Sequence, residues 1–79
     1  MVEHYDNLHI DCRISIEDQH GTLVYYRGKI TEMYMNKDRH PYMYKIEYNG
    51  TSRKIIPRIL DGVLTTNFRR NILRVYVDA

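Results

Sequence analysis

The sequence predicts a small all-β domain, built as a barrel of five short strands. Apolar and polar residues alternate with a period of two in several segments, as they do in half-buried strands. Turn-forming residues separate these segments, and no segment has the apolar spacing of an amphipathic helix of three turns or more. A barrel is expected because closure removes unpaired sheet edges. The 79 residues, 43% of them hydrophobic and 28% charged, suit one globular domain.

The first two strands are predicted on either side of a turn that contains glycine. Residues 8–17 alternate strictly between apolar and polar, which predicts a strand over this range. Residues 18–21 carry turn chemistry, since Asp caps its own backbone and Gly accepts a positive φ. A longer strand is predicted over residues 23–35, one face of which carries Tyr26, Gly28 and Ile30. Gly28 indicates a bulge, a sharp coil or the close approach of another backbone.

The third and fourth strands are predicted as a hairpin. A polar connection over residues 36–41 ends at a proline, and a strand over residues 42–48 follows it. Asn49-Gly50 is the dipeptide best suited to a type I′ turn, which places the fourth strand over residues 51–56. Pro57 ends that strand, because proline has no N–H to donate to a ladder.

The last third of the chain is less regular. Residues 58–66 fit a helical turn, an insert or a loop, and the sequence does not decide between them. Residues 67–71 are predicted as a short 3₁₀ or helical turn, and residues 72–77 as the fifth and last strand. The predicted organisation is therefore a flexible N-terminus over residues 1–7 and one domain over residues 8–79.

Cysteine usage and hydropathy predict a soluble, intracellular protein. Cys12 is the only cysteine and cannot form an internal disulfide, which favours a reducing compartment such as the nucleus or cytosol. No stretch approaches the roughly 18 apolar residues that span a bilayer.

Residues 1–20 hold five acids against Arg13, whereas residues 21–79 hold eleven Lys and Arg against five acids. The second part of the chain therefore favours an acidic partner or nucleic acid.

Four stretches of the chain follow the order of a known family. They are His20 to Ile30 (HGTLVYYRGKI), Lys37-Asp38, Tyr44 to Gly50 (YKIEYNG) and Asn71 to Arg74 (NILR). Together they resemble the chromo barrel or Tudor-knot family over about residues 8 to 77. The resemblance implies a five-stranded SH3-like barrel that reads histone tails or contacts nucleic acid. Such domains occur in MYST-type histone acetyltransferases and in MRG and male-specific-lethal chromatin proteins, which implies a nuclear protein that acts with other chromatin proteins.

The resemblance places a partial aromatic cage for methyl-lysine at Tyr26 and Tyr48. Rings around an ammonium group each contribute about 0.5–2 kcal/mol once water is excluded. A third ring is expected from Tyr44 or Tyr5, because strand alternation places Tyr25 on the face opposite Tyr26. Thr51 stands where the family has a tryptophan. The alternative is that the tyrosines of the third strand are core residues with their hydroxyls at the rim.

A second candidate site is a basic surface, because cationic side chains displace counterions from phosphates. Its predicted nucleic-acid-binding residues are Arg53, Lys54, Arg58, Arg69, Arg70 and Arg74. Arg53-Lys54 stands where the family carries an acidic pair, which favours a polyanion over a cationic histone tail. The alternatives are a solvated basic face and a free-standing small protein, for example a viral one, whose barrel docks on a partner protein in the cytoplasm.

The sequence predicts neither catalysis nor a cofactor. Its histidines share no metal-ligand spacing, and they are His4, His9, His20 and His40. Cys12 falls on the apolar side of the first predicted strand, where a thiol is usually inert. No phosphate-cradling glycine loop, nucleophile elbow or pair of carboxylates in a predicted cleft is present. The expected partners are therefore a histone tail, DNA or RNA, and not a membrane or a small-molecule substrate.

Overall fold

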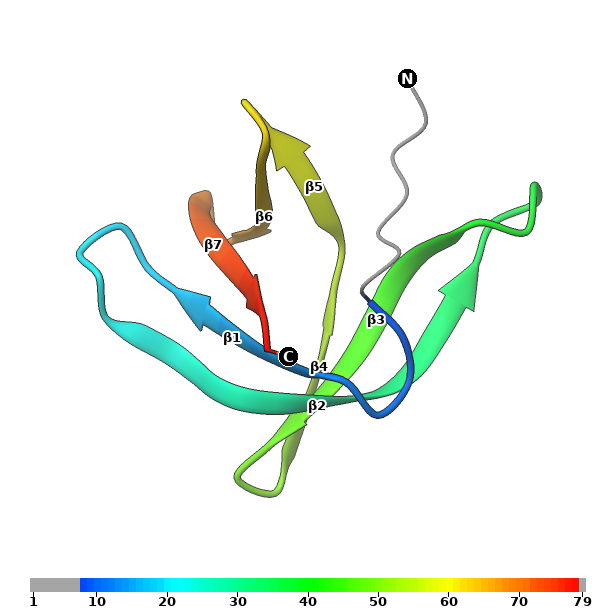
Figure 1. Ribbon diagram of the computed structural model, residues 1–79, viewed down its shortest axis with the longest axis horizontal. Helices are drawn as coiled ribbons and strands as arrows, with labels where there is room; N and C mark the ends of the chain where they lie inside the picture. The colour runs from blue at the N-terminus through cyan, green and yellow to red at the C-terminus, as the bar shows by residue number, and fades with distance from the viewer. Residues whose placement is uncertain (1–7, 79) are drawn as a thin grey trace.

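The computed structural model describes residues 8–78, which form one antiparallel sheet of seven strands without a helix (Figure 1). The strands are β1 (Arg13–Glu17), β2 (Leu23–Met35), β3 (Pro41–Tyr48), β4 (Thr51–Ile55), β5 (Pro57–Leu60), β6 (Val63–Phe68) and β7 (Asn71–Val77). Their order in the sheet is β4-β3-β2-β1-β7-β6-β5. The all-β prediction is confirmed, whereas the predicted number of five strands is wrong. No helix long and apolar enough to cross a membrane occurs in this part of the chain. The N-terminus predicted to be flexible lies outside the described residues.

The sheet curls into a half-barrel around the long strand β2 (Figure 1). The first part of β2 pairs with β1, and its second part pairs with β3, so both halves of the sheet share it. The two edge strands, β4 and β5, follow each other in the chain with only Ile56 between them. The chain itself therefore joins the two edges of the sheet, and the fold is barrel-like.

The hydrophobic core lies inside the curl. Alternate residues of the strands point inward, as the period-two pattern predicts, and each buried apolar side chain contributes about 1.5–3 kcal/mol to folding. The buried apolar side chains of the described residues come from the segment before β1 and from β1, β2, β3, β4 and β7; they are Leu8, Ile14, Ile16, Ile30, Tyr44, Ile46, Ile55, Leu73 and Val75. Each side of the half-barrel thus contributes to one core.

Three two-residue turns connect the strands of the second half of the chain. Asn49-Gly50 joins β3 to β4 with both residues at positive φ, which confirms the predicted type I′ hairpin. Asp61-Gly62 and Arg69-Arg70 join β5 to β6 and β6 to β7 with the same signs of φ. Residues 58–66, left undecided by the sequence, are therefore mainly a hairpin. The helical turn predicted over residues 67–71 is wrong, because these residues are the end of β6, the turn and the start of β7.

The first strand is shorter than its sequence pattern. β1 begins at Arg13, and the residues before it form a turn in which the Cys12 N–H donates to the His9 carbonyl over 3.2 Å. Asp11 has a φ of 76°, which an extended strand does not allow. Leu8 still packs into the core, whereas Ile10 is 49% exposed. The prediction of a strand over residues 8–17 is therefore wrong for residues 8–12, because the apolar alternation of the sequence continues through a turn.

A bulge in β2 changes which residues face the core. Ile14 pairs with Gly28 and Ile16 pairs with Tyr25, so the two residues between Tyr25 and Gly28 lie opposite Ser15 alone. The backbone N–H of Arg27, which has a φ of 55°, donates to the Ser15 hydroxyl over 3.0 Å. A bulge beside Gly28 is thus confirmed. Because the bulge adds one residue, Tyr25 faces inward with Ile16, and Tyr26 faces outward.

Candidate functional site

The structure does not bring the three predicted cage tyrosines together. Tyr44 is fully buried, with 0% of its surface exposed, and belongs to the core. Tyr26 is 58% exposed, and the bulge turns it to the outer face of the sheet. The ring of Tyr48 instead contacts that of Tyr25, with centroids 5.5 Å apart and planes tilted by 41°. The predicted pairing of Tyr26 with Tyr48 was therefore wrong, because the sequence pattern was read without the bulge. Tyr5 lies outside the described residues.

A cavity of about 230 Å³ lies at the open side of the half-barrel, between β4 and β6. Apolar side chains of the core and of β2 line it, together with the polar ends of β4 and β6. The lining residues are Ile16, Val24, Tyr25, Arg53, Lys54, Ile55, Thr66, Asn67, Phe68 and Leu73. This space is called the β4–β6 cavity below. It combines an apolar floor, two aromatic rings and two cations, which suits a planar ligand that carries negative charge nearby.

Arg53 and Phe68 face each other across this cavity. Arg53 pairs with Ile46, a core residue, and this register turns the Arg53 side chain to the inner face of the sheet. Its Cζ atom lies 3.8 Å from the centroid of the Phe68 ring, and the Cζ atom of Arg69 lies 5.3 Å from it. Such cation–π contacts contribute about 0.5–1 kcal/mol at exposed sites. The contact therefore places the Arg53 guanidinium over the Phe68 ring at the wall of the cavity.

A second cavity of about 250 Å³ adjoins the first where β4 passes into β5. Its lining residues are Lys54, Ile55, Ile56, Arg58 and Asn67. It is called the β4–β5 cavity below, and it shares Lys54, Ile55 and Asn67 with the β4–β6 cavity. The Thr66 hydroxyl donates to the Ile56 carbonyl over 3.2 Å and fixes the passage between the two strands. Two basic residues, Lys54 and Arg58, thus line a second space directly beside the first.

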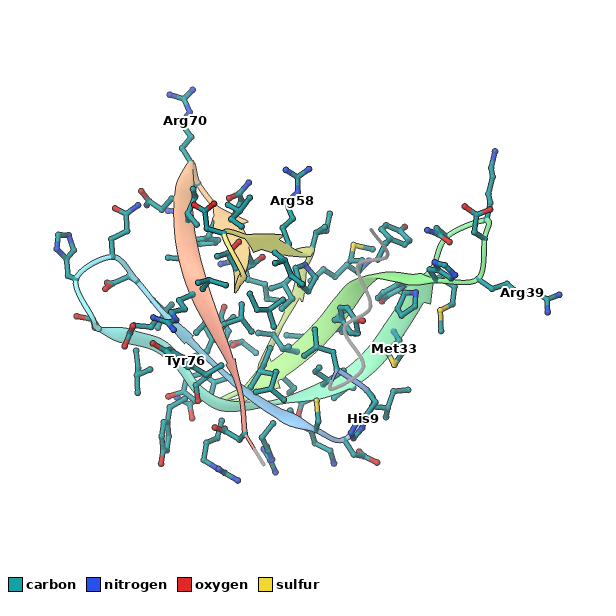
Figure 2. All side chains as sticks on the ribbon, turned by 45° about the horizontal axis from the view of Figure 1, so that its top comes forward. His9, Met33, Arg39, Arg58, Arg70 and Tyr76 are labelled. Carbon is teal, nitrogen blue, oxygen red and sulfur yellow. The ribbon has the colours of Figure 1, made fainter. Side chains whose placement is uncertain are left out.

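The remaining predicted basic residues lie on β5, on β7 and in the turn between β6 and β7. Arg58 and Arg74 both pair with Thr65, from opposite sides, so the two arginines flank it in one row across the sheet. Figure 2 shows Arg58 and Arg70 projecting from the same end of the molecule, away from Arg39 in the β2–β3 turn. The Arg74 Cζ atom lies 5.0 Å from the Tyr76 ring centroid. Of the six predicted basic residues, Arg53, Lys54 and Arg58 line the cavities and Arg69 contacts the Phe68 ring, whereas Arg70 and Arg74 lie outside the cavities.

None of these six side chains forms a salt bridge within residues 8–78. The ion pairs of this part of the chain are Arg27–Asp78, Lys29–Asp11 and Lys45–Glu32. The hydrogen bond and charge of Lys45 lower the pKa of Glu32, and the charge of Lys54 adds a smaller effect in the same direction. The Lys54 Nζ atom lies 5.0 Å from the Tyr34 ring centroid. Unpaired cations beside aromatic rings are the residue types that contact phosphates and bases.

The described residues hold no arrangement suited to a metal ion. Within residues 8–78, no three His, Cys, Asp or Glu side chains gather closely enough to ligate one. Cys12 is half-buried and packs against the core. His9, His20 and His40 lie in or beside turns, and His4 falls outside the described residues. The residues around the two cavities are instead basic, aromatic and apolar.

Sequence reasoning missed several residues of this surface. Phe68, the only phenylalanine of the chain, was assigned to a helical turn, although it directly precedes two of the predicted arginines. Tyr25 was placed on the wrong face, and Asn67 had no signal of its own.

Comparisons with protein-family models, with curated proteins and with solved structures found no match. The function is therefore argued from the geometry of the site.

Proposed function

We propose that the protein is a non-catalytic module that binds nucleic acid on the basic surface around the β4–β6 and β4–β5 cavities. The observation that carries the proposal is the stack of Arg53 on Phe68 at the cavity wall. Five more cations without a salt bridge in the described residues lie on β4, β5, β7 and the β6–β7 turn. Cations neutralise phosphates, and rings or guanidinium planes stack on bases, so this combination supports binding of both parts of a nucleotide.

The charge of the cavity favours a polyanion over a methylated lysine. Arg53 lines the same cavity as Tyr25, and the Arg69 Cζ atom lies 5.3 Å from the Phe68 ring of that cavity, so a methylammonium group there would meet two positive charges. The tyrosine rings also do not surround a common space, because Tyr44 is buried and Tyr26 faces outward. Reading of methyl-lysine is therefore the weaker proposal, and it becomes an outcome of the binding test.

The architecture supports a place for the module in the SH3-like class. A long strand shared by two halves of a curled sheet is the arrangement that the resemblance to chromo barrels implies. In this proposal, the hairpin of β5 and β6 stands where the family has a short helical turn. Chromatin and the nucleus are then the expected setting, because nucleic acid and chromatin proteins meet there. A free-standing protein that docks on an acidic partner is the competing proposal.

A binding titration at two salt concentrations tests the proposal. Labelled single strands of about 12 nucleotides, a duplex, a trimethyl-lysine peptide and an acidic peptide are each titrated by fluorescence anisotropy. For a single strand, each contacted phosphate adds about −0.7 to the slope of log affinity against log salt concentration. Four contacts give a slope of about −3, so binding weakens roughly 50-fold between about 50 and 200 mM salt.

Lys37→Gln is the matched control for charge. Lys37 is exposed in the β2–β3 turn, which lies away from the β6–β7 turn (Figure 1), so this variant is expected to bind like the wild type. Arg58→Gln and Arg74→Gln are each expected to make the salt slope shallower by about 0.7. Binding of the trimethyl-lysine peptide alone, or of the acidic peptide alone, would overturn the proposal. No binding of any strand at about 50 mM salt would do the same.

A further inference from the structure

The two neighbouring cavities differ in what they can hold. The β4–β6 cavity has an apolar floor and aromatic walls, whereas the β4–β5 cavity is lined by Lys54, Arg58 and Asn67 with less apolar wall. At about 230 Å³ the first is smaller than the roughly 300–1,000 Å³ pockets that enclose a drug-sized ligand. It therefore suits one planar ring of a larger ligand, the rest of which lies outside.

The Arg53 guanidinium lies over the Phe68 ring at the wall of the β4–β6 cavity. A guanidinium is planar and stacks on rings through either face, and Arg53 lines the cavity as well as contacting the ring. A base that enters the cavity would extend the stack of phenyl ring and guanidinium by one layer. Tyr25 and Val24 lie on the β2 side of the same cavity and would contact such a base from there. The aromatic contact is indifferent to base identity, because every base has a π face.

The edge of β4 adds a backbone donor beside the second cavity. β4 is the last strand of the sheet, so one of its sides has no partner strand. Tyr48 pairs with Thr51 across the two-residue turn, and hydrogen-bonded pairs then alternate along the hairpin, which directs the N–H of Lys54 away from β3. The Lys54 side chain lies on the outer face of the sheet beside Tyr34, so the Lys54 N–H and the Arg58 guanidinium are the two donors for the oxygens of one phosphate.

We infer that one nucleotide of a single strand straddles the edge of β4, with its base in the β4–β6 cavity on Arg53 and its phosphate in the β4–β5 cavity. The inference rests on the proposed function and names the strand type that this site takes. The shared lining of Lys54, Ile55 and Asn67 makes the two cavities adjacent, as the base and phosphate of one nucleotide are. A duplex does not fit this arrangement, because its bases are paired and stacked inside the helix.

Titration with matched strands separates the two contacts. The probes are a thymidine strand of about 12 nucleotides, an abasic strand with the same number of phosphates, and a duplex of equal length. The wild type is expected to bind the thymidine strand roughly 5- to 150-fold more tightly than the abasic strand, which is the range for loss of one stacked base. The duplex is expected to bind more weakly than the thymidine strand at equal salt.

Substitutions at the two cavities are expected to change different quantities. Arg53→Lys keeps the charge but removes the planar face, so the preference for the thymidine strand should fall toward 1 while the salt slope stays. Arg58→Gln should make the salt slope shallower by about 0.7 and keep that preference. Lys37→Gln should change neither quantity. Thermal unfolding of each variant verifies that the fold is retained.

The outcomes distinguish this inference from the proposed function. If no strand binds, the proposed function fails and the inference fails with it. If strands bind but the abasic strand binds equally well, or Arg53→Lys keeps the preference, only the base position is wrong. If Arg58→Gln leaves the salt slope unchanged, the phosphate position is wrong. Tighter binding of the duplex would overturn the assignment to single strands.

Discussion

The Arg53 Cζ atom lies 3.8 Å from the centroid of the Phe68 ring, although the strands that carry these residues do not pair with each other. β4 and β6 are separated in the sheet order by four other strands, so this contact spans the open side of the half-barrel. Side chains thus connect the two halves of the fold where no ladder of backbone hydrogen bonds does. The same contact that forms the wall of the cavity is expected to stabilise the curled sheet.

A double-mutant cycle measures this contribution. Arg53→Met keeps the aliphatic length without the charge, and Phe68→Leu keeps an apolar side chain without the ring. We expect a coupling energy of about 0.5–1 kcal/mol between the two substitutions, the range of exposed cation–π contacts. Urea denaturation of the four proteins gives the cycle. A coupling below about 0.3 kcal/mol, which is the scatter of independent sites, would contradict a stabilising contact.

The Arg69-Arg70 turn is expected to be strained in a way that the other two turns of its type are not. Both arginines have positive φ, 48° and 70°, whereas Asn49-Gly50 and Asp61-Gly62 provide residues that accept this geometry readily. Non-glycine residues in this region cost of the order of 1 kcal/mol or more each. The double substitution Arg69→Asn with Arg70→Gly is therefore expected to raise the free energy of unfolding by about 1 kcal/mol or more.

The same double substitution is expected to weaken binding of a single strand. It removes two cations, so the salt slope should become shallower by up to about 1.4 if both arginines contact phosphates. The control that replaces both arginines with lysine keeps the charge and the strain, and should leave stability and salt slope close to wild type. Denaturation and anisotropy are measured on the same preparations. A more stable variant with unchanged salt slope would show that this turn takes no part in binding.

Turn chemistry explains which parts of the fold were predictable. Asn49-Gly50 predicts its hairpin correctly. Asp61-Gly62, within residues 58–66, is an equally strong signal of a two-residue hairpin turn. With that signal, β5 and β6 follow from the sequence. Arg69-Arg70 carries no turn preference, so nothing in the local sequence distinguishes this hairpin from a helical turn.

The bulge explains why the structure places Tyr26 and Tyr48 apart. The six basic residues were identified from charge alone, which does not depend on strand register. The cage tyrosines are predicted from period-two alternation. One extra residue between Tyr25 and Gly28 reverses which residues face inward in the part of β2 that precedes the bulge. Gly28 marked the bulge, but the sequence did not fix which of its neighbours would be the extra residue. The contact of Arg53 with Phe68 joins strands far apart in the sheet and has no local signal.

Alanine substitution of neighbouring tyrosines tests the assignment of faces. Tyr25 packs against the core and contacts the Tyr48 ring, whereas Tyr26 is mostly exposed. We expect Tyr25→Ala to lower the free energy of unfolding by about 1–3 kcal/mol, since it loses buried area and an aromatic pair. Tyr26→Ala should change it by less than about 0.5 kcal/mol. Urea denaturation of both variants decides the point, and the reverse order of effects would place Tyr26 on the inner face.

The stabilisation of the β1–β2 turn by Asp18 is expected to be lost in acid. One carboxylate oxygen, Oδ1, accepts the backbone N–H groups of Thr22 and His20 at 2.9 and 2.8 Å. These hydrogen bonds, that from Thr22 being the larger influence, hold the pKa of Asp18 below its ordinary value of 3.8. Since the folded pKa is the lower one, the stabilisation is complete above the unfolded value. It is lost as the pH falls below 3.8 and through the folded pKa.

Asp18→Asn is the matched variant, because its amide oxygen still accepts the two N–H groups but does not titrate in this range. The wild type is expected to be more stable than Asp18→Asn near pH 6, since hydrogen bonds to a charged acceptor are the stronger ones. That difference should shrink as the pH falls below about 3.8, where the carboxylate becomes protonated first in the unfolded chain. Urea denaturation of both proteins at several pH values measures the difference. If it stays constant between about pH 6 and pH 3, the turn is not held by the Asp18 charge, because a neutral acceptor would then serve equally well.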